Sequence, residues 1–207
     1  MSTGRGRPLL KFLLTLLFLV VIAAAVVRAF VLLPAQAEGN EMAPAVFRGD
    51  WVAAAMRDKP VRGDIVIYEH PQKRKVLRMA RVIGLPGETV AFKDQVVSAA
   101  GKELARTKVD KFMLEEPGVT GGRQMERLRE TSPDGRSWNV LMDVRRRTRD
   151  IEIAAKDGFV VLGDNRNHAV DSREHGPVPV ANVRGVVRYY ISAKPVKGIE
   201  PRGTRVQ

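Results

Sequence analysis

The stretch Glu38-Gly39-Asn40-Glu41-Met42-Ala43-Pro44 decides the fold of this chain when it is taken together with three later motifs. Those motifs are Arg81-Val82-Ile83-Gly84-Leu85-Pro86-Gly87, Gly163-Asp164-Asn165-Arg166 and Asp171-Ser172-Arg173. An apolar run over residues 12–33 ends a few residues before the first motif. Each motif alone is a weak signal, but the apolar run followed by all of them in this order is a strong one.

The order of these motifs resembles the type I signal peptidase family, whose members are membrane-anchored serine peptidases with a Ser-Lys dyad. The resemblance extends from the apolar run to about Ser192 and leaves out residues 105–150. It implies an all-β fold, in which a β-rich extracytoplasmic domain of the signal peptidase type follows an N-terminal transmembrane helix. The short β-branched and apolar runs of the chain independently favour strands, and long helical periods are lacking after the apolar run.

Two positions depart from the family pattern. The nucleophilic Ser of the family directly precedes the Met of a G-x-S-M-x-P motif, and this position is Glu41 here. The general-base Lys directly precedes the Arg of a K-R motif, and this position is Ala80. A third position, Ala169, stands where the family often has a small hydroxyl residue that hydrogen-bonds to the Lys.

These substitutions bear directly on the chemistry. A serine hydroxyl needs a base to take its proton, and in such a dyad the base is a lysine kept neutral by desolvation. Ala80 has no titratable group, and Arg78 on the same face of the strand cannot act as a base because a guanidinium does not deprotonate in proteins. Glu41 is a weak nucleophile toward an amide. We therefore expect no competent catalytic residues and a non-catalytic homologue.

The resemblance also implies a groove that binds an exported polypeptide segment or signal peptide as an added β-strand, a mode that does not require the dyad. Its walls are expected around residues 33–39 and 77–80. The residues expected to line it are Gly39, Met42, Pro44, Arg78 and Ala80.

The other motif residues have a structural interpretation, as parts of turns and of an ion pair between Asp171 and Arg173. They are Arg81, Gly84, Pro86, Gly87, Gly163, Asp164, Asn165, Asp171, Ser172 and Arg173. The three histidines, His70, His168 and His175, are expected on the surface or in loops. No spacing of metal ligands is visible, and no cofactor is expected.

The apolar run 12–33 is long enough for a transmembrane helix if Arg28 extends its charge to an interface. The basic residues Arg5, Arg7 and Lys11 precede it, so the positive-inside rule places the N-terminus in the cytoplasm and the main domain outside the plasma (inner) membrane, after a single pass. The alternative is a cleavable signal, because Ala35-Gln36-Ala37 fits an A-x-A cleavage pattern.

Composition narrows the choice of partners. The chain has a formal net charge of +12 and no cysteine, so packing rather than disulfides must stabilise the domain. Basic clusters at 73–75 and 145–149 indicate a solvated face or attraction to anionic membrane lipid. Nucleic acid is not an expected partner, because no recognition module accompanies the charge.

The expected organisation has five parts. They are a cytoplasmic start (1–11), the span (12–33), a β domain (34–104 and 151–192), an inserted subdomain or loops (105–150) and a frayed C-terminal tail (193–207). Strands are expected at 51–56, 65–68, 76–83, 89–92, 138–142, 158–162 and 186–191, with a hairpin over 96–104.

Two alternative functions remain open at this point. One is an active signal peptidase with displaced catalytic groups, for which the candidates are Ser98, Ser172, Lys93 and Lys102. The other is a purely structural subunit of a membrane complex, with other membrane proteins as partners and an occluded groove.

Overall fold

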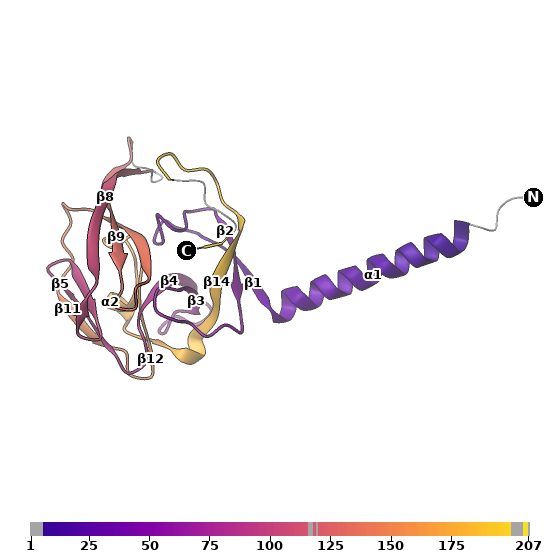
Figure 1. Cartoon of the computed structure of the whole chain (residues 1–207), viewed down its shortest axis with the longest axis horizontal. Coiled ribbons are helices and arrows are strands. Elements are labelled where there is room, and N and C mark those ends of the chain that lie inside the picture. Colours follow the sequence, from indigo (N-terminus) through magenta and orange to yellow (C-terminus); the bar gives the residue numbers. More distant parts are fainter. Residues whose placement is uncertain (1–5, 116–117, 119, 200–204, 207) are drawn as a thin grey trace, which may run out of the picture.

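The computed structural model describes residues 6–115, 118, 120–199 and 205–206. One long helix, α1 (Gly6–Phe30), extends away from a β-rich domain, as Figure 1 shows. Its segment Pro8–Val26 is long and apolar enough to cross a membrane, and its side chains are exposed. The side chain of Arg28 lies outside the described residues.

The helix is shorter at its C-terminal end than the sequence predicts. It ends at Phe30, and β1 (Leu32–Gln36) begins two residues later, so the end of the apolar run belongs to the domain. Pro34 accounts for this boundary, because proline cannot continue a helix and disfavours helical backbone in the residue before it. Leu33 packs partly buried against the main hydrophobic core.

A seven-stranded sheet forms the centre of the domain, in the order β1-β2-β14-β3-β4-β12-β13. Every pairing in it is antiparallel. The expected strands appear here with small shifts of their ends. The bounds are β2 (Trp51–Ala55), β3 (Ile65–Glu69), β4 (Leu77–Gly84), β12 (Gly158–Leu162), β13 (Val178–Pro179) and β14 (Val183–Ser192).

Two smaller sheets flank the central one, with orders β11-β5-β6-β7 and β10-β9-β8. The expected hairpin over 96–104 is confirmed as β6 and β7. The strands are β5 (Thr89–Lys93), β6 (Val96–Ala99), β7 (Lys102–Glu103), β8 (Ala105–Leu114), β9 (Arg123–Thr131), β10 (Ser137–Met142) and β11 (Ile151–Ala154). The helical turns are α2 (Ser172–His175) and η1 (Val180–Asn182).

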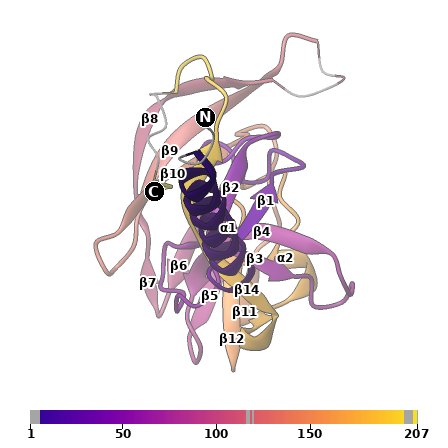
Figure 2. The ribbon, with the colours of Figure 1, turned by 90° about the vertical axis from the view of Figure 1, so that its right-hand side faces the viewer.

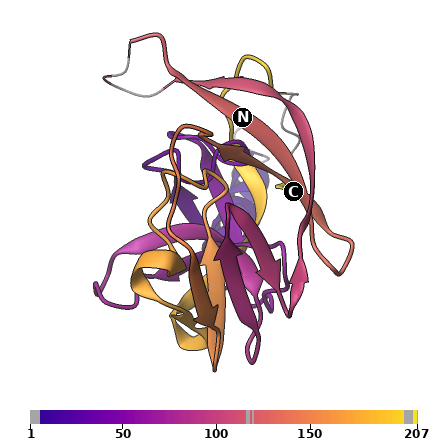
Figure 3. The same ribbon diagram turned by 90° about the vertical axis from the view of Figure 1, so that its left-hand side faces the viewer.

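The segment 105–150 contains two long strands that the sequence pattern did not show. β8 and β9 form a hairpin along one side of the domain, as Figures 2 and 3 show. Most side chains of β8 are exposed or half-buried, so no alternation of apolar and polar residues marks it as a strand. The predicted strand at 138–142 is confirmed as β10.

A buried ion pair between Arg81 and Asp164 joins the second and third motifs. Arg81 donates from Nε and Nη2 to the two carboxylate oxygens of Asp164, at 2.8 and 2.6 Å. Neither side chain is more than 1% exposed. Arg81 also donates to the carbonyl of Gly63, and its guanidinium lies 5.3 Å from the ring centre of Trp138 in β10.

A second buried cluster ties the β8–β10 sheet to the same loop. Glu130 in β9 accepts from both Arg166, at 2.8 and 2.6 Å, and Arg106, at 3.0 and 2.7 Å. Burial works to raise the pKa of Glu130, but the two guanidinium groups outweigh it and keep that pKa below its usual range. The carboxylate therefore stays charged inside the protein.

The expectation of a frayed C-terminal tail is wrong for the part of the tail that the structure describes. Val196 and Ile199 pack against a hydrophobic cluster that contains Phe47 and Phe112. Arg205 pairs with Tyr189 of β14. These contacts remove apolar surface of the tail from water, which favours a packed tail. The polar composition of the tail did not indicate this packing.

We expect Arg81→Met to lower the free energy of unfolding by about 3–5 kcal/mol, because it leaves the buried Asp164 without its partner. The double variant Arg81→Met/Asp164→Leu should lose less, since it removes both buried charges. Denaturant unfolding of the full chain in detergent, followed by tryptophan fluorescence, measures this.

The control is Arg184→Met, which removes a pair with Glu69 in which the arginine side chain is 45% exposed. It should cost less than about 1 kcal/mol. Equal losses for Arg81→Met and Arg184→Met would contradict the central role of the buried pair.

Candidate functional site

A groove of about 370 Å³ lies between β1 and the first half of β4. Residues Leu77–Ala80 of β4 pair with β3 alone, because the β12 pairing involves only Arg81, Val82 and Gly84. β1 pairs only with β2 and forms the edge of the sheet. Within the described residues, the two walls of the groove are therefore strand edges without a partner strand. Among the lining residues are Ala35, Ala37, Gly39, Glu41, Met42, Ile67, Leu77, Arg78, Met79 and Val170.

An ion pair crosses this groove. Arg78 Nη1 donates to Glu41 Oε1 at 3.3 Å, and the two side chains are 32% and 33% exposed. The carboxylate of Glu41 folds over Gly39, where a Cβ atom would lie only 2.2 Å from Oε2. Gly39 therefore leaves the space that this carboxylate occupies. Sequence reasoning did not pair these two residues, although Arg78 was expected to face the groove.

Three of the five residues expected to line the groove do so, namely Gly39, Met42 and Arg78. Pro44 and Ala80 are buried and are not among its lining residues. Ala80 is 1% exposed and belongs to the same hydrophobic cluster as Met42. Its methyl group is thus part of the core.

Two of the three positions singled out as replaced, Glu41 and Ala169, pack against Gly163, and the third, Ala80, directly precedes the last β4 residue that pairs with β12. The pairing of β12 with β4 ends at Leu162 and Arg81. The residue that follows Leu162 is Gly163, and the residue that precedes Arg81 is Ala80. A Cβ atom at Gly163 would lie 2.2 Å from the Cβ of Ala169 and 2.8 Å from the carbonyl oxygen of Glu41. Only glycine fits this approach.

The remaining motif residues hold this arrangement together. Asn165 donates its backbone N–H to the carbonyl of Glu41 at 2.9 Å. Asp171 accepts from the backbone N–H of Gly163 at 2.9 Å and forms the expected ion pair with Arg173, at 2.6 Å. Ser172 Oγ accepts from the backbone N–H of Val161 at 2.9 Å.

The second motif ends in a turn. Gly84 approaches the side chain of Val90 so closely that a Cβ would lie 2.6 Å from it. Gly87 follows Pro86 and has a φ of +87°, which favours glycine.

A family model described as signal peptidase, peptidase S26, matches residues 9–191. The chain belongs to this family. It is similar to curated proteins named Signal peptidase I from Rickettsia canadensis (strain McKiel) and Rickettsia massiliae (strain Mtu5), with 33% and 32% identity over 134 residues. These alignments cover 60% of the chain and 49% and 48% of the relatives, so the chain spans about half the length of the curated relatives it matches. A crystal structure of a signal peptidase I from Enterococcus faecalis V583 is 26% identical, with 62% of this chain and 97% of that chain covered and a TM-score of 0.37.

Membership of the signal peptidase family and the exposed apolar helix α1 together fit a membrane-anchored protein. None of the residues considered as displaced catalytic groups lines the groove, as far as the described residues extend. Ser172 is 1% exposed and hydrogen-bonded to the backbone, and Lys93 forms an exposed contact with Glu152 at 3.8 Å. Ser98 lies in β6 and Lys102 in β7, outside the central sheet.

His70 lies in the loop after β3, one of its two expected locations, but it is buried, with 4% of its surface exposed. The expectation for His175 is wrong, because this residue lies in α2 and is 6% exposed. The rings of these two histidines meet edge-on with centres 4.8 Å apart. His175 Nδ1 lies 2.8 Å from the carbonyl of Gly176, which requires a proton on Nδ1, so Nε2 is left to accept from the hydroxyl of Tyr68 at 3.0 Å. His168 is half-buried.

Burial favours the uncharged form of both histidines in this cluster, because it lowers their pKa values. Burial lowers the pKa of His175, against the hydrogen bond to Gly176 that works to raise it. Burial also raises the pKa of the Tyr68 hydroxyl. No sequence signal separated these histidines from surface ones, because their partners lie far away along the chain.

We expect the protein to lose stability as the pH falls below about 6.5, the ordinary pKa of histidine. The unfolded chain binds a proton at His175 more readily than the folded chain, so acid favours unfolding and the stability is fully present only above that pH. Denaturant unfolding at a series of pH values measures the slope. His175→Gln should flatten it between about pH 6.5 and 5. Identical slopes in the two proteins would show that His175 does not titrate on unfolding.

Proposed function

We propose that this chain is a non-catalytic member of the signal peptidase family that holds an exported polypeptide segment, or a signal peptide, as an extended strand in its groove. The observation that carries the proposal is the groove between β1 and β4, open and crossed by the Glu41–Arg78 ion pair. A purely structural subunit would not need an open groove of this kind.

The chemistry of the groove supports the absence of peptidase activity. The carboxylate of Glu41 is paired with Arg78, and Ala80 contributes a buried methyl group. Acyl transfer needs a nucleophile within reach of a base, and among the described residues no lysine lines this groove.

The walls of the groove favour an extended and mostly small or apolar ligand. The free edges of β1 and of Leu77–Ala80 offer backbone hydrogen bonds to a peptide between them. The side chains of Ala35, Ile67 and Val170 present apolar surface to it. The backbone contacts would supply affinity, and the side-chain contacts would supply selectivity.

The membrane arrangement is part of the proposal. Helix α1 crosses the membrane once, with Arg7 and Lys11 on the cytoplasmic side and the β domain outside. Membrane lipid and other membrane proteins are its further expected neighbours. The exported segment would then reach the groove from the same membrane.

We expect the purified full chain not to cleave a model preprotein, because it lacks the base and the hydroxyl nucleophile. The variant Glu41→Ser/Ala80→Lys restores both groups and should cleave weakly. Adding Ala169→Ser should improve cleavage, because the new lysine gains a hydrogen-bonding partner that fixes its geometry. Gel analysis of the preprotein over time, with each variant at equal concentration, measures this.

Specific cleavage by the unmodified chain, well above a mock preparation, would disprove the non-catalytic proposal and favour displaced catalytic groups. Equal rates for the double and triple variants would show that residue 169 plays no part.

We expect Glu41→Gln to strengthen binding of a peptide with an acidic residue at the centre of the groove, because it leaves Arg78 without its carboxylate partner. Arg78→Gln should do the opposite and favour a basic residue there. Each change should amount to about fivefold in affinity, since a half-exposed charge pair contributes at most about 1 kcal/mol. Fluorescence titration with matched acidic, neutral and basic peptides measures both.

The control is Glu69→Gln, which removes the same charge at a pair outside the groove. It should leave all three peptide affinities unchanged. If no peptide binds to any variant, the groove is closed in solution, and the structural-subunit hypothesis is the better one.

A further inference from the structure

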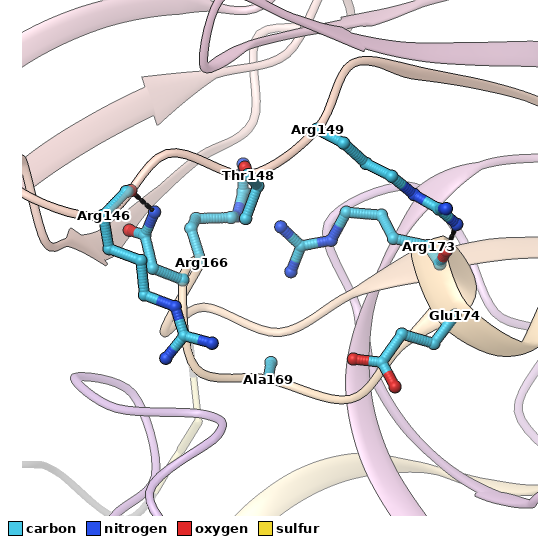
Figure 4. A pocket seen from close by; sticks show the side chains of 8 residues that line it. Arg146, Thr148, Arg149, Arg166, Ala169, Arg173 and Glu174 are labelled. Atoms are coloured by element: carbon cyan, nitrogen blue, oxygen red, sulfur yellow. Dashed lines mark hydrogen bonds between the residues drawn. The ribbon is translucent and has the colours of Figure 1, made fainter.

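A second cavity, of about 480 Å³, lies beside α2 on the other side of the segment that carries Ala169. Ala169 lines this cavity, while the next residue, Val170, lines the peptide groove. Within the part of the chain that the structure describes, four arginines line it, Arg146, Arg149, Arg166 and Arg173, and Glu174 is the only acidic residue that does so (Figure 4). The cavity is therefore strongly basic for its size.

Two of the four arginines have their charge compensated inside the protein. Arg166 is fully buried and bonded to both oxygens of Glu130. Arg173 is paired with Asp171.

Arg146 and Arg149 carry the uncompensated charge. Both are exposed, and no carboxylate of the described residues lies within salt-bridge distance of either. Their hydrogen bonds go to neutral groups, His168 Nδ1 at 3.3 Å and the carbonyl of Arg173 at 3.3 Å. These two exposed guanidinium groups line the cavity and can therefore bind an anion.

The buried wall of the cavity offers a further donor. Arg173 is 8% exposed, and its Nη1 is a buried nitrogen with no hydrogen-bond partner. Figure 4 shows its guanidinium reaching toward the middle of the cavity, between Arg166 and Glu174. A buried donor without an acceptor is costly, so an acceptor supplied by a ligand would stabilise it.

We propose that this cavity is a binding site for a phosphate group. A guanidinium presents planar, forked donors that match phosphate oxygens, and a tetrahedral anion can accept from Arg146, Arg149 and Arg173 at once. The phosphate is either a free anion or the headgroup of an anionic lipid, because the chemistry is the same for both. The site is independent of the peptide groove and of its proposed function.

Glu174 gives the site a distinctive signature. Its carboxylate faces the same cavity as the arginines (Figure 4) and has no salt-bridge partner among the described residues. This carboxylate repels a bound phosphate and lowers the affinity of the cavity for phosphate. Removing its charge should therefore tighten binding, which a merely solvated basic surface would not do selectively.

The test uses the full chain in neutral detergent at low ionic strength, where screening is weak. Calorimetric titration with inorganic phosphate compares the unmodified chain with Arg146→Gln/Arg149→Gln and Glu174→Gln. The control is Arg147→Gln, which removes the same charge from an exposed neighbour that does not line the cavity. We expect the double variant to weaken phosphate binding about tenfold or more, Glu174→Gln to strengthen it severalfold, and Arg147→Gln to change it less than about twofold.

A second arm identifies the source of the phosphate. Binding of the full chain to neutral vesicles is compared with its binding to vesicles rich in phosphatidylglycerol. If the chain binds the anionic vesicles, if the double variant does not, and if inorganic phosphate competes with this binding, the site belongs to a lipid headgroup. Phosphate binding without a vesicle difference assigns it to a free anion. If neither probe binds, or if Arg147→Gln weakens binding as much as the double variant, the cavity is not a phosphate site and the proposal is wrong.

Discussion

The buried ion pair between Arg81 and Asp164 is the constraint on which the rest of this structure depends. Asp164 stands between Gly163, against which Ala169 and the carbonyl of Glu41 pack, and Asn165, which donates to that same carbonyl. The pair thereby fixes the position of the first motif against β4. Because a buried charge without its partner is costly, a variant that removes one of the two residues should be less stable than one that removes both. None of these contacts uses the side chains at positions 41 and 80, so the architecture is independent of what chemistry those side chains provide.

Arginine has two separate roles in this molecule. Buried guanidiniums of Arg81, Arg166 and Arg173 each bind a carboxylate with two donors and hold loops in place. Exposed arginines such as Arg146 and Arg149 make up the surplus of positive charge instead. The first set explains how a domain without disulfides keeps long connections ordered, and the second set concentrates positive charge in the segment between β10 and β11.

The fold could be predicted from the sequence where motifs or apolar runs marked it, and not elsewhere. The runs at 65–68 and 158–162 are buried on both faces, so their composition alone indicated β3 and β12. β8 and β9 were missed because their side chains are mostly polar and their pairing, not their burial, defines them. At the site, the position of Arg78 followed from strand alternation, whereas its pairing with Glu41 depends on two segments 37 residues apart. The burial of His175 likewise comes from the fold of α2 over the sheet, which no local pattern encodes.

A single residue, Val31, separates the end of α1 from the start of β1, and β1 is a wall of the groove. If α1 spans a bilayer, this wall cannot move far from the lipid surface, because one residue of extended chain reaches only about 3.5 Å. Encounters with a membrane-bound chain then take place by diffusion in two dimensions, at a fixed height above the lipid. The short junction thus limits the distance between the groove and the membrane. This distance determines which part of a neighbouring chain the groove can contact, independently of side-chain recognition.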